Sequence, residues 1–183
     1  MPRHRAVIVT PIPKEFSAIC ELLEDIRPES HDRTTYRRGT LSSNGISWDI
    51  LVVECGQGNA ASALETEKAL NYFKPNVTIL SGIAGGIKDV EIGHVIAANQ
   101  VLTYEFAKIG NKEDVKARPC GHACDYGLIQ IAKEVRRSKS WLKRLSDRDL
   151  KKKPEAHEGT IISGEKLVAT KRAKLVKFIK SNY

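Results

Sequence analysis

The residues best suited to bind a ligand form two glycine-rich stretches that each follow an apolar run. The first covers residues 81–87, reads SGIAGGI, and comes directly after the run 77–80, which is predicted to be a buried strand. Glycine and alanine at the end of a strand leave backbone N–H groups uncovered, and α/β folds bind ligands at the carboxyl ends of their strands. An ordinary loop rarely needs so many small residues, so this stretch is predicted to line a ligand.

The second glycine stretch, residues 56–61, reads GQGNAA and has the G-x-G-x-x-A spacing of a dinucleotide-binding turn. Such a turn normally works with an acidic residue at the end of the next strand, which holds the ribose hydroxyls. The next strand ends at Leu80-Ser81 without an acid. A tight turn between a strand and a helix explains the glycines at least as well, so NAD binding ranks below the other hypotheses.

The four cysteines are candidates for metal binding. Cys120, His122 and Cys124 are spaced like half of a zinc site, but a structural zinc needs four ligands and the sequence has no second pair of this kind. Cys20 and Cys55 lie in apolar segments and are predicted to be buried free thiols. The sequence therefore predicts no metal site.

The formal net charge of +8 is concentrated in one part of the chain. Residues 133–153 hold ten basic and three acidic side chains, a net charge of +7. Such a stretch is typical either of a docking surface for nucleic acid or of a solvent-exposed helix and loop. Trp141 is its only aromatic residue, which leaves no platform for stacking bases, and the solvent-exposed helix is favoured.

The elements that position these residues alternate between strands and helices. The run Ala6-Val7-Ile8-Val9 is typical of a strand buried on both faces, and Asn44-Gly45 predicts a hairpin turn. Strands are predicted at 6–9, 36–41, 47–54, 77–80, 94–104 and 160–163. Helices are predicted at 14–25, 59–73, 126–138 and 170–181, and loops at 109–124 and 147–158. The 183 residues suit a single α/β domain, with a central mixed sheet covered by helices on both faces.

Two features of the sequence bear on its location. Its apolar runs are far shorter than the roughly 20 residues that span a bilayer. The basic segment from Met1 to Arg5 is followed only by the apolar run Ala6 to Val9, whereas a signal peptide needs an apolar stretch of about 7–15 residues. The protein is predicted to be cytoplasmic.

The stretch 81–95, SGIAGGIKDVEIGHV, resembles the signature of the nucleoside phosphorylase superfamily. Four further segments agree with it in chain order: 10–18 (TPIPKEFSA), 56–61 (GQGNAA), 101–105 (VLTYE) and 163–168 (SGEKLV). The chain is most similar to the branch of 5′-methylthioadenosine/S-adenosylhomocysteine nucleosidases and the related domains of defence proteins. The resemblance covers nearly the whole chain and implies that family's α/β fold.

The resemblance implies cleavage of the N-glycosidic bond of a purine nucleoside through an oxocarbenium-like transition state, with water or phosphate as the attacking group. Glu15 matches the glutamate that positions the water, although the helix dipole alone would also explain an acid in the first turn of a helix. The residues that match the substrate-binding positions are Gly82, Ile83, Ala84, Gly85 and Gly86 beside the ribose, and Leu167 and Val168 against the purine. The resemblance implies no cofactor, apart from inorganic phosphate in a phosphorylase, and a dimer or larger homo-oligomer.

Two departures from the family pattern shape the prediction. Ile83 stands where many members have a serine or threonine that helps bind phosphate or water, which favours hydrolysis over phosphorolysis. The family continues beyond the position of Tyr183 with a glutamate that binds the ribose and an aspartate that protonates the leaving purine. Neither has a counterpart in this sequence, so a C-terminally truncated domain is predicted. The alternative is a nucleoside-sensing or effector module without turnover, and a nucleic-acid-binding domain ranks below both.

Overall fold

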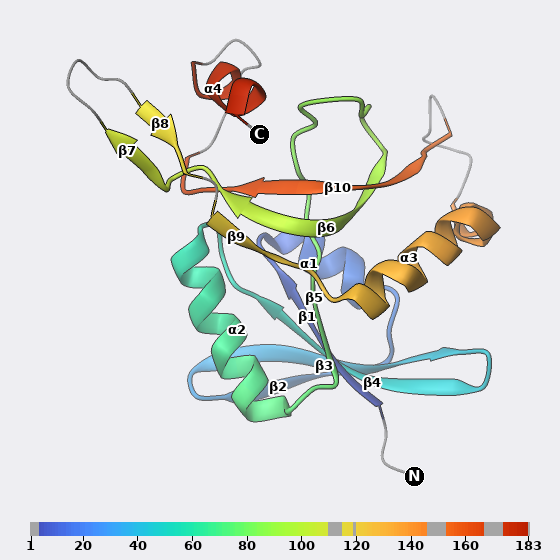
Figure 1. The fold of residues 1–183 in the computed structure, drawn as a ribbon. Helices are drawn as coiled ribbons and strands as arrows, with labels where there is room; N and C mark the ends of the chain where they lie inside the picture. The colour runs from blue at the N-terminus through green and yellow to red at the C-terminus, as the bar shows by residue number, and fades with distance from the viewer. Residues whose placement is uncertain (1–3, 110–114, 119, 146–152, 167–173, 183) are drawn as a thin grey trace. The chain divides into compact units, whose positions relative to one another are not determined.

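The structure is a computed structural model that describes residues 4–109, 115–118, 120–145, 153–166 and 174–182 (Figure 1). The chain divides into two compact units, Met1–Ala84 and Gly85–Tyr183. Each unit has a principal sheet of its own, which is five-stranded in the first unit and three-stranded in the second.

The first unit is built on a mixed sheet. Its elements are β1 (His4–Thr10), α1 (Pro13–Cys20), β2 (Glu24–His31), β3 (Thr34–Ser43), β4 (Ile46–Glu54), α2 (Asn59–Phe73) and β5 (Val77–Leu80). The strand order is β2-β3-β4-β1-β5. β1 runs parallel to β4 and β5, whereas β3 is antiparallel to β2 and β4. The parallel part brings the carboxyl ends of β1 and β5 to the same edge.

Both faces of this sheet are covered, as the apolar run in β1 predicts. Val7 and Val9 belong to a buried cluster that includes Phe73 of α2. Ala6 belongs to a second cluster, against which Phe16 of α1 packs. Neighbouring residues of a strand point to opposite faces, so the two clusters lie on opposite faces of β1. The two helices therefore cover opposite faces of the sheet.

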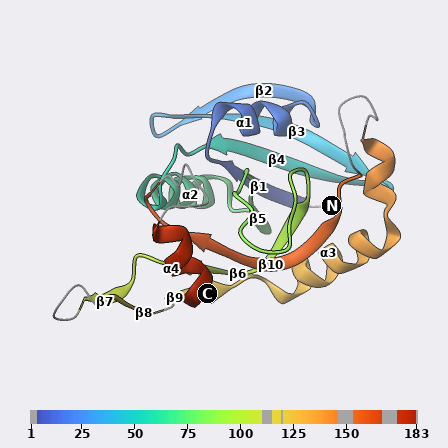
Figure 2. The same cartoon turned by 90° about the horizontal axis from the view of Figure 1, so that it is seen from above.

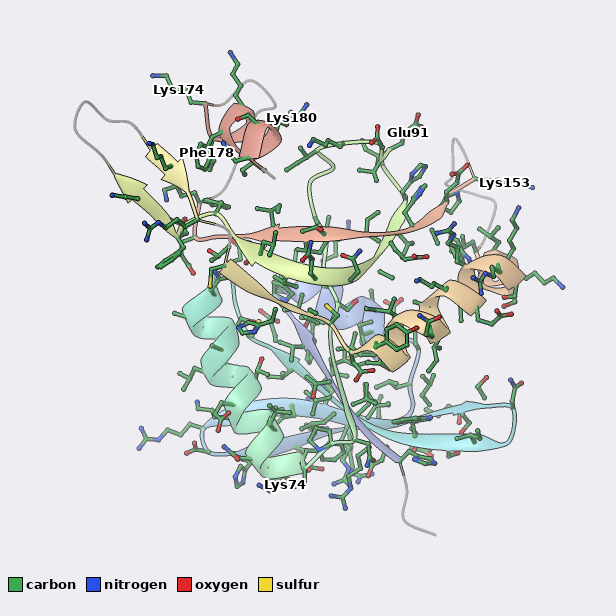
Figure 3. All side chains as sticks on the ribbon, viewed as in Figure 1. Lys74, Glu91, Lys153, Lys174, Phe178 and Lys180 are labelled. Atoms are coloured by element: carbon green, nitrogen blue, oxygen red, sulfur yellow. The ribbon has the colours of Figure 1, made fainter. Side chains whose placement is uncertain are left out.

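Two local signals in the first unit have the predicted effect. β3 and β4 form an antiparallel hairpin that is closed by Asn44 and Gly45, with φ of 50° and 76°. These left-handed angles suit asparagine and glycine. α2 ends at Phe73, where Lys74 (Figure 3) also adopts a left-handed conformation and donates its N–H to the carbonyl of Leu70 at 3.0 Å. The predicted hairpin and the predicted end of the helix are confirmed.

The helix predicted over 14–25 is too long. α1 ends at Cys20, and β2 begins at Glu24, inside the predicted helix. Glu24 pairs with Thr40 of β3, and Leu23 packs against the apolar cluster under α1. Sheet pairing and burial of Leu23 therefore override the helical pattern of the segment.

The prediction that residues 77–80 form a strand is confirmed, but the prediction that this strand is buried is wrong. Ile79 and Leu80 are 44% and 62% exposed. β5 is the outer strand of the five-stranded sheet and pairs only with β1 among its strands. An apolar run identifies a strand, but it does not distinguish a central strand from an edge strand.

The second unit is built on a three-stranded sheet against which α3 packs. Its elements are β6 (Val95–Thr103), β7 (Ala107–Ile109), β8 (Val115–Ala117), β9 (Cys120–Ala123), α3 (Tyr126–Ser138), the 3-10 helix η2 (Ser140–Arg144), β10 (Ala156–Ser163) and α4 (Lys174–Asn182). β6 pairs in parallel with β10, which runs beside it in Figures 1 and 2, and antiparallel with β9. β7 and β8 form a separate pair. The predicted α/β class, with a mixed sheet flanked by helices, is confirmed.

The stretches 109–124 and 147–158, predicted to be loops, contain strands. β8 and β9 lie in the first stretch, and β10 begins in the second. β9 reads CGHA, which has none of the β-branched or aromatic residues that favour strands. Its pairing with β6 depends on close approach, because a Cβ on Gly121 would overlap the carbonyl oxygen of Val101.

The basic stretch is partly neutralised where the structure describes it. Lys133 and Arg136 of α3 lie 3.7 and 2.8 Å from the two carboxylate oxygens of Glu158 on β10. Arg137 pairs with Glu134 on the same helix. These pairs fit the predicted solvent-exposed helix, while residues 146–152 of the stretch lie outside the described residues.

The four cysteines are free thiols. Cys55 is buried and Cys20 is half-buried, and burial raises the pKa of the Cys20 thiol while the charge of Arg37 partly opposes this shift. Across the described ranges, no three His, Cys, Asp or Glu side chains gather closely enough to hold a metal ion. No helix in the described part of the chain combines the length and the apolar character needed to cross a membrane.

Candidate active site

Glu15 lies in the first turn of α1, just after the chain leaves β1. Pro13 is the first residue of this helix, where its missing N–H has no cost because the first N–H groups of a helix lack partners within it. Glu15 follows two residues later, where the positive end of the helix dipole favours an acid. Glu15 is nearly buried, with 9% of its surface exposed.

Both carboxylate oxygens of Glu15 accept hydrogen bonds from backbone N–H groups. Ile12 donates to Oε2 at 3.0 Å, and Ile83 donates to Oε1 at 2.6 Å. Ile12 comes after β1 and Ile83 after β5, and these parallel strands end together because Val9 pairs with Leu80. The carboxylate thus joins the two loops at the carboxyl edge of the sheet.

Gly82 allows the loop after β5 to approach Glu15. A Cβ on this residue would lie 3.3 Å from Oε1 of Glu15 and 3.3 Å from Cδ of Pro11, closer than ordinary van der Waals contact. The requirement for glycine here is therefore a matter of space.

We expect Gly82→Ala to lower the free energy of unfolding by about 1–3 kcal/mol, the usual effect of adding a methyl group to a filled site. The ring of Pro11 is rigid and Glu15 is held by two hydrogen bonds, so neither can move aside freely. Gly159→Ala is the matched control, because its Cβ would meet Ile96 at an ordinary 3.5 Å. Urea denaturation measures both variants, and equal losses would contradict the close packing around Gly82.

The backbone N–H of Ile12 is a part of this site that sequence patterns do not single out, because a backbone donor has no side-chain signature. The one available signal is spacing. An acid three residues after the residue that precedes a helix can fold back onto the N–H of that residue. Glu15 stands in this relation to Ile12.

The structure brings together Glu15, Gly82 and Ile83, three of the residues predicted for the site. Ile83 contributes its backbone N–H, while the residue itself is 74% exposed. The catalytic and binding roles of these three residues stay predictions.

The other predicted site residues are not part of this contact. Ala84 is the last residue of the first unit, and Gly85 and Gly86 are the first two of the second. Leu167 and Val168 lie outside the described residues. Their proposed contacts with ribose and purine likewise stay predictions.

A carboxylate fixed in this way keeps acceptor capacity for a further partner. Each oxygen of a carboxylate has about two lone-pair sites. One site on each Glu15 oxygen is used by a backbone N–H group. The arrangement can therefore orient a small donor such as water and accept its proton.

Known proteins are similar to this chain over most of its length. The chain is 23% identical over 167 residues to the 5′-methylthioadenosine/S-adenosylhomocysteine nucleosidase of Maridesulfovibrio salexigens, a match that covers 89% of this chain and 65% of that protein. It is 24% identical over 135 residues to the nucleosidase of the same name from Chromohalobacter salexigens, covering 72% of this chain and 56% of that protein. The matches thus span less than two thirds of the length of either relative.

Solved structures share the fold. The 5′-methylthioadenosine/S-adenosylhomocysteine nucleosidase of Colwellia psychrerythraea in complex with adenine matches with a TM-score of 0.78 and 20% identity, over 100% of this chain and 70% of that one. A futalosine hydrolase mutant of Helicobacter pylori matches with a TM-score of 0.74 and 20% identity, over 98% and 76%. The family model described as the phosphorylase superfamily matches residues 5–182, from β1 through Glu15 and the glycine loop to α4. The chain belongs to the phosphorylase superfamily.

Proposed function

We propose that this chain takes part in hydrolysis of the N-glycosidic bond of a purine nucleoside or nucleotide, with Glu15 activating the attacking water. The names of the relatives support this reaction, since the matched proteins of M. salexigens and C. psychrerythraea are 5′-methylthioadenosine/S-adenosylhomocysteine nucleosidases. The observation that carries the proposal is the nearly buried Glu15 carboxylate, held between the N–H groups of Ile12 and Ile83. The two nucleosides in those names are the first substrates to test.

In the proposed reaction, a water molecule hydrogen-bonded to Glu15 attacks the anomeric carbon of the ribose. The C–O bond forms as the C–N bond breaks, the electron pair of the C–N bond leaves with the purine, and Glu15 accepts a proton from the water. The nearby carboxylate also stabilises the positive charge that develops on the ribosyl group. The purine takes up a proton as it leaves, a step that the resemblance assigns to an aspartate.

Hydrolysis is proposed rather than phosphorolysis because of Ile83. Its backbone N–H donates to Glu15, and its apolar side chain has no donor for a phosphate. Residues 82–86 lie beside the ribose in this proposal, and Leu167 and Val168 lie against the purine. We also propose that residues 1–183 belong to one nucleosidase-like domain that works as a homo-oligomer, as the resemblance implies.

Chromatography of free purine tests the proposal, with methylthioadenosine, S-adenosylhomocysteine, adenosine, inosine and ATP as substrates. We expect release from at least one of them without phosphate. Release only in the presence of phosphate would identify phosphorolysis and contradict the argument from Ile83. Nucleoside binding in calorimetry without release would identify a sensing module, and a folded protein that neither binds nor releases would overturn the proposal.

A further inference from the structure

Two histidine side chains meet where β6 and β10 begin. His94 directly precedes β6, and His157 is the second residue of β10. These strands are parallel, with His157 paired to Ile96, so both histidines lie at the amino edge of the second sheet (Figure 1). The N–H of Val95 donates to the carbonyl of Glu155 at 2.8 Å, which fixes the backbone next to each histidine.

The two imidazole rings stack and bring one nitrogen of each ring together. The ring centres lie 5.0 Å apart with an angle of 28° between the planes, and Nδ1 of His94 lies 3.1 Å from Nε2 of His157. Two nitrogens that bind one metal ion at about 2.0–2.1 Å, at a right angle or at the tetrahedral angle, are about 2.8–3.4 Å apart. The pair therefore has the spacing of two ligands of one ion. The same spacing suits a hydrogen bond between the rings, which a metal ion would replace.

The backbone beside His94 keeps a lone pair on its Nδ1. The N–H of Glu91 donates to this nitrogen at 3.4 Å, and the N–H of His94 donates to the carbonyl of Glu91 at 3.2 Å. A ring nitrogen that accepts a hydrogen bond carries no proton, and imidazole binds metals through such a nitrogen. The contact with Glu91 is longer than the usual distance of about 2.9–3.0 Å, so a metal ion can take its place.

The cavity beside the two rings favours a cation. It has a volume of about 560 Å³ and is lined by both histidines. Its charged lining residues are three acids and one base, which with neutral histidines give a formal charge of −2: Asp89, Glu91, Glu155 and Lys153. Oε2 of Glu155 lies 3.6 Å from Nε2 of His157, where it can accept a hydrogen bond from water bound to an ion. His94 is half-buried and the side chain of His157 is 33% exposed, so an ion can reach them from solvent.

The donor atoms indicate which class of ion fits. Imidazole nitrogens suit Zn²⁺, Cu²⁺ and Ni²⁺, whereas Mg²⁺ and Ca²⁺ prefer oxygen ligands. Within the part of the chain that the structure describes, no third His, Cys, Asp or Glu side chain joins the pair closely enough to complete a site. Water must therefore fill the remaining positions.

We propose that His94 and His157 bind a divalent transition-metal ion, with water completing its coordination. Such an ion joins the loop before β6 to the start of β10. The inference is independent of the proposed function and gives the ion no part in the reaction at Glu15.

Calorimetric titration of Ni²⁺ into the 183-residue protein, without an affinity tag, tests this inference. We expect one ion per chain. His94→Asn and His157→Gln should each weaken Ni²⁺ binding about 100-fold, because the loss of even an outer partner of a metal ligand costs about 10–100-fold. His122→Asn is the matched control and should bind like the wild type, since His122 is an exposed histidine of the same unit, between Cys120 and Cys124.

Thermal unfolding gives a second readout. Without metal, the curves establish that each variant is folded. Ni²⁺ should raise the melting temperature of the wild type and of His122→Asn, but not that of His94→Asn or His157→Gln, because an ion stabilises only a protein that binds it. Glu155→Gln should weaken binding less than either histidine variant, since it leaves both nitrogens in place.

Three results would overturn the inference. The first is a wild-type protein that does not bind Ni²⁺. The second is binding by folded His94→Asn and His157→Gln that is as tight as in the wild type. The third is loss of binding in His122→Asn alone, which would place the ion beside the cysteines of β9.

Discussion

Glu15→Gln is expected to release purine about 10²–10⁴ times more slowly than the wild-type protein, the range lost when a positioned general base is removed. Glutamine has nearly the shape of glutamate but cannot take a proton from water. It also fits its surroundings poorly, because the groups that face it, the N–H groups of Ile12 and Ile83, are both donors. An amide has a single acceptor oxygen, so its NH₂ group would face one of these donors.

Product chromatography with methylthioadenosine measures this effect. Glu21→Gln is the matched control, because Glu21 caps the C-terminal end of the same helix and is exposed. It should release purine at the wild-type rate. A thermal unfolding curve for Glu15→Gln establishes that the variant is folded, and a folded variant as fast as Glu21→Gln would contradict the role proposed for Glu15.

The second large effect is on stability: we expect Arg38→Met to lower the free energy of unfolding by about 3 kcal/mol. Arg38 donates from Nε and Nη2 to the two oxygens of Asp49, at 2.9 and 2.7 Å, and from Nη1 to Glu29 at 3.2 Å. Tyr72 donates its hydroxyl to Glu29, and the guanidinium carbon lies 5.1 Å from the centre of the Phe73 ring. Asp49 is only 7% exposed, so the substitution removes the two-pronged partner of a nearly buried carboxylate.

Urea denaturation compares this variant with Arg137→Met. Arg137 and Glu134 form an ion pair whose side chains are 69% and 73% exposed, so its loss should change the free energy of unfolding by about 0.5 kcal/mol or less. Adding Asp49→Leu to Arg38→Met should recover part of the loss, because it removes the carboxylate left behind. Equal unfolding free energies for the two single variants would show that the contacts of Arg38 are no stronger than those of an exposed pair.

The elements that sequence predicts well are those with strong local signals. The hairpin turn at Asn44-Gly45 needs only the left-handed preference of two residues. α3 follows the capping residue Asp125, whose side chain accepts a hydrogen bond from the N–H of Leu128. The predicted bounds of α3 agree with the structure. The sequence does not predict β2 and β9, because these segments become strands only by pairing with β3 and β6. Tertiary pairing of this kind leaves no periodic trace in a short polar segment.

In the candidate site, too, the individual residues can be predicted from the sequence, but their contact cannot. The first turn of a helix favours an acid, and the glycine-rich stretch follows a predicted strand, so Glu15 and Gly82 each stand out in the sequence. Their contact depends on the parallel register in which Val9 meets Leu80, which brings the two loops to one edge. The register follows from packing across the whole sheet. The hydrogen bond from Ile83 to Glu15 therefore becomes visible only in the structure.

The position of β1 between β4 and β5 has a consequence for synthesis of the chain. Val9 pairs with Val53 and with Leu80, so β1 leaves the ribosome before either of these partner strands. At about 5–20 residues per second, roughly two to nine seconds pass before Val53 is added. The β3–β4 hairpin forms within about 1–10 μs once its residues are available. Insertion of β1 beside that preformed hairpin is therefore expected to be the slow step in folding of the first unit, with the apolar run from Ala6 to Val9 open to chaperones until then.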